Sequence, residues 1–214
     1  MRKLLFSNGS PFGRRVRIVL AEMGLEYEPD ILDAIRPVEQ IKQHNPALQV
    51  PVLYDGERHL FGSNLIVQYL LATYPTDQLR RPPMSATMTR AERHWDDKQI
   101  LTAIETVSDA MVNIRLLEGV SRESVPYVGR QEVRIASCID WLEQRIHSDG
   151  FWPGTFSIMD IYLICPLLWG KQRGIFDYQR TSWPRVNAMI SQWKHRESIL
   201  ATPIKAPAAA LPGS

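Results

Sequence analysis

The apolar residues of this chain change their spacing at one place, the stretch PTDQLRRPP at residues 75–83, which holds three prolines and almost no periodic apolar signal. Before it, short apolar runs alternate with amphipathic segments, as strands alternate with helices. After it, long amphipathic segments follow near residues 85–118, 122–147, 158–173 and 184–194. This change predicts a mixed α/β domain followed by an all-helical domain. The predicted boundaries are 1–76 for the first domain, 77–84 for the linker, 85–203 for the second domain and 204–214 for a tail.

The first half predicts a definite series of strands and helices. Pro11 suits the first position of a helix that runs to Met23, and Gly24 suits its stop. Pro29 keeps the strand EYEPDIL away from the centre of a sheet. The other expected elements are the strand KLLF, the short helix VEQIKQH, a hairpin VPVLYDGERHLF turning around Asp55-Gly56, and a helix from Ser63 to Tyr74.

Composition excludes several classes of function. The chain is 44% apolar and 22% charged, as ordinary globular proteins are, and its net charge of +2 is too small to indicate nucleic-acid binding. No CxxC pair, Cys/His cluster or HExxH motif supports a metal site, and Cys138 and Cys165 lie in helical stretches, as buried reduced thiols do. No apolar run suits a signal peptide or a membrane span. We therefore expect a cytoplasmic protein without metal, nucleic acid or membrane as partner.

One helix start in the second half is clearly marked. In TFSIMDIYL, Ser157 stands at a cap position and Asp160 three residues later, which approximates a capping box. Phe156 and Ile161 are spaced to form the accompanying hydrophobic staple. The motif predicts a firmly anchored helix.

These pieces occur in a recognisable order: a strand, Ser-Pro opening the helix that ends VRIVLAEMGLEYE, then NPALQVPVLYDG, LFGSNLIVQYL, a proline linker and FSIMDIYL. In this order the chain resembles the cytosolic glutathione transferases of the bacterial serine type, up to about residue 200. The resemblance implies a thioredoxin-like N-terminal domain, an all-α C-terminal helical bundle and a homodimer. It also implies glutathione as a co-substrate, with no further cofactor, and a small hydrophobic electrophile between the domains.

Ser10 is the leading catalytic candidate. A serine before Pro11 is by itself typical of a helix cap. The resemblance implies more, because serine-type members place their active hydroxyl here, whereas tyrosine-type members use the end of the first strand, where this chain has Phe6. Ser7 is the second candidate and Asn8 the third. A cysteine is absent from position 10, so conjugation, elimination or isomerisation is favoured over thiol transfer.

The proposed chemistry of Ser10 is donation of a hydrogen bond. The thiol of glutathione ionises like that of free cysteine, with a pKa of about 8.5, and serine is too weak a base to remove its proton. A hydroxyl can instead donate to the thiolate and favour it. The helix start adds its dipole and the amides of Phe12 and Gly13.

Further glutathione contacts follow from the resemblance. Pro51 is expected to be cis, with Val50 pairing its backbone with the cysteinyl part of glutathione and Gln49 beside it. Ser63, which we also expect to cap its helix, holds the γ-glutamyl carboxylate in the family. The residue before that serine is usually acidic, but here it is Gly62. Asn64, or Asp97 of the partner subunit, offers a replacement for the missing acid.

Less specific candidates complete the site. Arg36 occupies the loop where many members contact the glycyl carboxylate, although a solvated arginine explains it equally well, and His44 is similar. Phe12 follows the active turn. Candidates for the co-substrate pocket are Met111, Arg115 and Trp169. Methionine and aromatic residues at helical spacing more often belong to a core.

Three functions stay open at this point. The first is an enzyme that activates the glutathione thiolate for attack on an electrophile. The second is a non-catalytic binding protein of the bacterial stringent-starvation type, which partners a polymerase. The third is a lyase, dehalogenase or isomerase that uses the same thiolate.

Overall fold

The structure is a computed structural model that describes residues 1–32, 38–77, 79, 90–117, 126–180 and 183–205. The chain divides into two compact units. The first consists of Met1–Gln78 together with Arg196–Ser214, and the second of Leu79–His195. The predicted linker falls almost entirely outside the described residues, so the predicted domain boundaries stay predictions.

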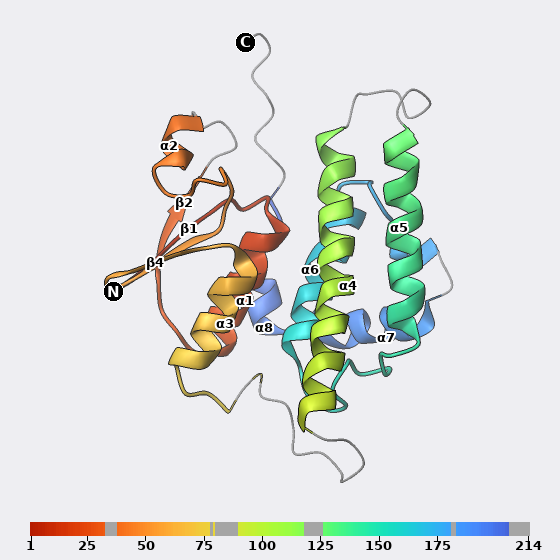
Figure 1. Cartoon of the computed structure of the whole chain (residues 1–214). Helices are drawn as coiled ribbons and strands as arrows, with labels where there is room; N and C mark the ends of the chain where they lie inside the picture. The colour runs from red at the N-terminus through yellow and green to blue at the C-terminus, as the bar shows by residue number, and fades with distance from the viewer. Residues whose placement is uncertain (33–37, 78, 80–89, 118–125, 181–182, 206–214) are drawn as a thin grey trace. The chain divides into compact units, whose positions relative to one another are not determined.

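The first unit is built on a four-stranded mixed sheet (Figure 1), the thioredoxin-like arrangement that the resemblance implied. Its strands are β1 (Arg2–Phe6), β2 (Glu28–Ile31), β3 (Val52–Asp55) and β4 (Arg58–Phe61). Their order is β2-β1-β3-β4, with β1 and β2 parallel and the other pairs antiparallel. The strand with Pro29 therefore lies at an edge, as predicted. The hairpin is also confirmed, with Asp55 opposite Arg58 and a two-residue loop between them.

Helices of the first unit match the apolar spacing of its sequence. They are α1 (Pro11–Glu22), α2 (Val38–Lys42), α3 (Ser63–Thr73) and α8 (Glu197–Leu200). The first and third pack together on one face of the sheet (Figure 1). The central strand β1 is buried from Leu4 to Phe6, and Val16, Val19 and Leu20 of α1 are fully buried as well. Burial of this apolar face supplies the main driving force for the unit.

The second unit is helical in its described residues, as predicted. Its elements are α4 (Arg90–Leu116), α5 (Pro126–Glu143), α6 (Ile158–Gln172), the 3₁₀ turn η2 (Tyr178–Arg180) and α7 (Pro184–Trp193). Helix α4 packs on both α5 and α6. Helix α6 is buried on nearly every side, which explains why its sequence is apolar all round. No helix among the described residues has the length and hydropathy that crossing a membrane requires.

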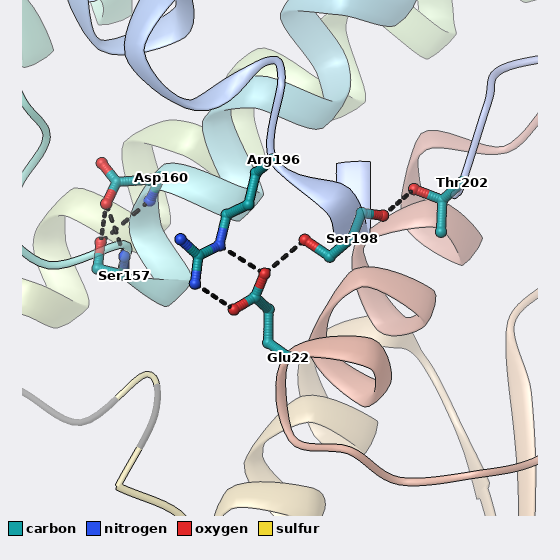
Figure 2. Close-up of polar contacts among 6 residues, drawn as sticks. All are labelled: Glu22, Ser157, Asp160, Arg196, Ser198 and Thr202. Atoms are coloured by element: carbon teal, nitrogen blue, oxygen red, sulfur yellow. Dashed lines mark hydrogen bonds and ion pairs between the residues drawn. The ribbon is translucent and has the colours of Figure 1, made fainter. Parts of the chain in front are cut away.

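The predicted capping box at the start of α6 is confirmed (Figure 2). Asp160 Oδ2 accepts hydrogen bonds from the backbone N–H of Ser157 at 2.7 Å and from its hydroxyl at 2.6 Å, and Asp160 Oδ1 accepts from the N–H of Phe151 at 3.0 Å. Burial raises the pKa of the Asp160 carboxyl to about 6, although these hydrogen bonds lower it. Gly150 lies so close that an added Cβ would stand 2.7 Å from Asp160 Oδ1.

Candidate functional site

The strand pairing brings three predicted site segments to one end of the sheet. Strand β1 ends at Phe6, just before the turn of residues 7–10 that carries Ser10. Strand β3 runs antiparallel to β1 and begins at Val52, directly after Val50 and Pro51. Strand β4 runs antiparallel to β3 and ends at Phe61, directly before the start of α3. All three segments therefore leave the sheet at the same end.

The turn of residues 7–10 is closed by its own backbone. The N–H of Ser10 donates to Ser7 O at 3.1 Å, and the N–H of Gly9 donates to the Ser7 hydroxyl at 3.3 Å. Asn8, the third catalytic candidate, accepts a hydrogen bond at Oδ1 from Arg17 at 3.3 Å. Ser7 and Asn8 thus hold the turn that presents Ser10.

Ser10 is the N-cap of α1. Its Oγ accepts a hydrogen bond from the N–H of Gly13 at 3.1 Å. This bond uses an oxygen lone pair, and within the described residues Ser10 Oγ makes no other hydrogen bond, so its hydroxyl hydrogen is available to an acceptor. We expected the backbone N–H groups of both Phe12 and Gly13 to be available to the thiolate. This was wrong for Gly13, because its N–H donates to the Ser10 cap. The N–H of Phe12 lies in the first helical turn, where no intrahelical acceptor exists.

Three arginines follow Ser10 in α1, and two of them are buried. Arg14 is 5% exposed and Arg15 is fully buried. The guanidinium of Arg15 stacks over the ring of Phe12, 4.9 Å from its centroid, and that of Arg17 lies 4.5 Å from the centroid of Phe6. These stacked cations flank the start of α1 with positive charge.

The peptide bond between Val50 and Pro51 is cis, as the resemblance implied. The loop before it is held by Asn45, a residue that the sequence analysis missed. The buried Asn45 side chain accepts from the N–H of Ala47 and donates to Gln49 O, both at 2.8 Å. Between them Leu48 has a φ of +58°, in the left-handed region. The Asn45-Pro46 pair is the sequence signal for such an Asx turn.

His44 is bound to the neighbouring hairpin. Its Nδ1 lies 2.7 Å from the Tyr54 hydroxyl, and His59 donates from Nε2 to His44 O at 2.6 Å. The rings of Tyr54 and His59 stack at 4.6 Å. This cluster ties the loop after α2 to β3 and β4, so a contact of His44 with glutathione stays a prediction.

The start of α3 corrects one expectation. Ser63 is not the cap: Gly62 occupies that position with a φ of +87°, and no side chain caps the helix. Ser63 is the first helical residue and is nearly buried at 7% exposure. The N–H of Gly62 donates to Pro51 O at 3.3 Å, which joins this segment to the cis-proline segment. Asn64 accepts from Gln68 at 3.1 Å.

The remaining candidates lie elsewhere. Arg36 falls outside the described residues. Met111, in α4, is fully buried with its sulfur against Gly170, and Trp169 in α6 is 5% exposed, so both belong to the core of the second unit. Arg115 near the end of α4 is partly exposed. Burial lowers the pKa of Arg173, and the positive charge of Arg115 lowers it further. A role for these residues in a pocket stays a prediction. The described residues hold no cluster of three His, Cys, Asp or Glu side chains suited to a metal.

Comparison with known proteins gives the first unit a family. Residues 4–80 match the family described as the N-terminal domain of glutathione S-transferase. A solved glutathione S-transferase of Methylobacillus flagellatus KT with glutathione bound is 25% identical and has a TM-score of 0.74, covering 95% of this chain and 99% of that one.

Two kinds of protein occur among the relatives by sequence. A stringent starvation protein A homolog of Pasteurella multocida is 28% identical, over 92% of this chain and 87% of that protein. Glutathione S-transferase U1 of Arabidopsis thaliana is also 28% identical, over 92% of this chain and 86% of that protein. The chain is therefore as similar in sequence to a stringent starvation protein A homolog as to a glutathione transferase.

Proposed function

Because residues 4–80 match the N-terminal domain of glutathione S-transferase, we propose that the chain is a cytosolic glutathione transferase that binds glutathione at the end of the sheet where its three site segments meet. The thiolate of glutathione attacks a small hydrophobic electrophile, forming a carbon–sulfur bond while the leaving group departs with the bonding electrons. The observation that carries this proposal is the Ser10 hydroxyl, which caps α1 as an acceptor and still has its hydrogen to donate.

The energetic demand on Ser10 is modest. Lowering the pKa of a thiol by two units takes about 2.7 kcal/mol. One charge-assisted hydrogen bond together with the helix dipole supplies a stabilisation of this order. Ser10 acts as a donor to sulfur, and Phe12 contributes its backbone N–H at the same helix start.

The other segments bind the rest of the tripeptide. Val50 pairs its backbone with the cysteinyl part, as an added strand does, with Gln49 beside it. The Ser63 hydroxyl and the open amides of the start of α3 receive the γ-glutamyl carboxylate. Gly62 leaves the γ-glutamyl ammonium without an adjacent acid, which predicts weak binding, and Gly62→Glu should tighten it.

The test is the ultraviolet absorbance of the thiolate of bound glutathione, measured against pH. Ser10→Ala should raise the pKa of the bound thiol by about one to two units, towards that of free glutathione. Ser10→Thr keeps the hydroxyl and should preserve the low value. Ser191→Ala, at an exposed position of α7, is the control. An unchanged titration in Ser10→Ala contradicts the role of Ser10.

A second candidate is a non-catalytic binding protein, which the similarity to stringent starvation protein A homologs favours. Gly62 in place of an acid agrees with it. Retention on immobilised glutathione, followed by assays with aryl halides, isothiocyanates and organic peroxides, separates the two. Absence of both retention and activity favours the binding protein. Turnover that needs glutathione but ends in elimination, loss of a halide or isomerisation identifies a lyase, dehalogenase or isomerase.

We also propose that the chain forms a homodimer in the cytoplasm. The first unit exposes three large apolar side chains near its site segments, Leu48 at 43%, Phe61 at 39% and Leu65 at 51%. A second copy is the proposed cover for them. Light scattering tests the mass, and Leu65→Lys should shift it to that of a monomer.

A further inference from the structure

The chain returns to its first unit after the helical one. Residues Arg196–Lys205, here called the return segment, belong to the same compact unit as the sheet, and α8 within it contacts α1 (Figure 1). The predicted second domain, 85–203, included most of these residues with the helical half. Their contacts follow α1 from its end back to its start.

The first anchor lies at the end of α1 (Figure 2). Arg196 donates to both carboxylate oxygens of Glu22, at 2.6 Å from Nε and 2.7 Å from Nη2, and the Ser198 hydroxyl adds a third bond at 2.5 Å. The Glu22 side chain is only 5% exposed. The hydrogen bond that Arg196 donates to Glu22 raises the pKa of Arg196. A buried carboxylate with this many charge-assisted bonds holds its partners firmly.

The second anchor lies two turns nearer the start of the helix. Arg14 donates from Nε to Thr202 O at 2.8 Å and from Nη2 to Ile199 O at 3.2 Å. The Thr202 hydroxyl donates to Ser198 O at 2.9 Å, which closes the segment on itself (Figure 2). Arg14 and Thr202 are 5% and 4% exposed, so these bonds are shielded from water.

The last contact reaches the turn that carries Ser10. The N–H of Lys205 donates to Asn8 O at 3.3 Å, while Arg17 holds Asn8 Oδ1. Asn8 is thus fixed from two sides, two positions before Ser10. Loops are the more mobile parts of a fold, and a hydrogen-bond donor must be placed within about 0.5 Å to act on a reacting atom.

We propose that the return segment positions the Ser10 turn, with Glu22 and Arg14 as positioning residues for the hydroxyl that holds the thiolate. This inference rests on the proposed function for its catalytic consequence. The fixed position of the turn itself is a property of the protein without any ligand, and this allows the two claims to be tested apart.

Two truncations make the test. A chain that ends at Lys205 keeps the bond to Asn8, and one that ends at Pro203 lacks it. Hydrogen exchange of the amides of Gly9, Ser10 and Gly13, without glutathione, should accelerate in the shorter chain alone. With glutathione, kcat/KM should fall roughly two- to tenfold in the shorter chain, with a raised pKa of the bound thiol. Identical exchange in both chains overturns the inference.

Substitution of the anchor gives an independent measurement. Glu22→Gln should accelerate hydrogen exchange of the same amides and raise the pKa of the bound thiol, at temperatures well below unfolding. Glu197→Gln removes the same charge from an exposed position of α8 and should change neither. If glutathione bound to the full chain forms no thiolate at all, the proposed function fails. The hydrogen-exchange data alone then decide whether the return segment positions the Ser10 turn. Equal exchange in the two variants overturns it.

Discussion

Two serines cap helices in the part of the chain that the structure describes, and their surroundings differ. Ser157 is fully buried, and its hydroxyl both accepts from Asp160 N at 3.2 Å and donates to Asp160 Oδ2 at 2.6 Å. Ser10 is partly exposed, and its hydroxyl only accepts, from Gly13. A cap whose donor and acceptor are both used stabilises a helix and can do nothing else. A cap with its donor still available can also bind a ligand.

The largest expected effect belongs to the fully used cap. Asp160→Ala leaves the buried N–H groups of Ser157 and Phe151 without acceptors and should lower the free energy of unfolding by about 3 kcal/mol. Denaturant unfolding followed by circular dichroism measures it. The titration of bound glutathione in the folded fraction should stay unchanged, and a shifted titration would contradict the separation of the two roles.

The pH dependence of this cap should be the next largest effect. The pKa of Asp160 is raised to about 6 in the folded chain, mainly by burial, from 3.8. The stabilisation that is linked to protonation of Asp160 is therefore full below pH 3.8 and is lost as pH rises through 6. The stability difference between the native chain and Asp160→Asn should shrink by about 2 kcal/mol from pH 4.5 to 7.5. A constant difference would contradict the raised pKa.

Asn45, like Ser157, both donates and accepts a hydrogen bond within the protein, but it lies beside the proposed site. Asn45→Ala frees both Ala47 N and Gln49 O, so glutathione affinity should fall about tenfold by calorimetry. Asn45→Asp keeps the acceptor and loses the donor to Gln49, and should give part of this loss. Full affinity in Asn45→Ala would show that Val50 is positioned without this side chain.

The smallest change in stability separates the two functions of Ser10. Ser10→Asp retains a cap acceptor for Gly13 but has no hydrogen to donate and carries a negative charge. Its free energy of unfolding should stay within about 0.5 kcal/mol of the native value. The pKa of the bound thiol should nevertheless rise, because the carboxylate repels the thiolate. A stable variant with an unchanged titration would mean that Ser10 is only a cap.

Local patterns predicted most of the fold. The helices around Val16 and Leu70, the edge strand at Pro29 and the capping box of Ser157 depend on residues a few positions apart, which a sequence displays directly. The resemblance placed the glutathione contacts in the first unit, and the strand pairing added that their segments meet at one end of the sheet. Ser63 failed as a cap because Gly62, with its positive φ, takes that position, and sequence rules favour serine there.

Long-range partners could not be read in the same way. Nothing near Arg14 and Arg15 in the sequence shows what covers them. The partner of Glu22 is Arg196, 174 residues away, in a stretch whose spacing resembles any short helix. Asn45 was readable as a turn, but its bond to Gln49 depends on a left-handed Leu48 that the sequence does not indicate.

The return segment also affects how the protein is made. A ribosome synthesises the sheet and α1 first and adds the residues that complete their unit only after the whole helical half. Until Arg196 emerges, Glu22 lacks the guanidinium that donates two hydrogen bonds to its carboxylate. The contacts of the α/β unit can therefore be completed only at the end of translation, although most of the unit is translated first.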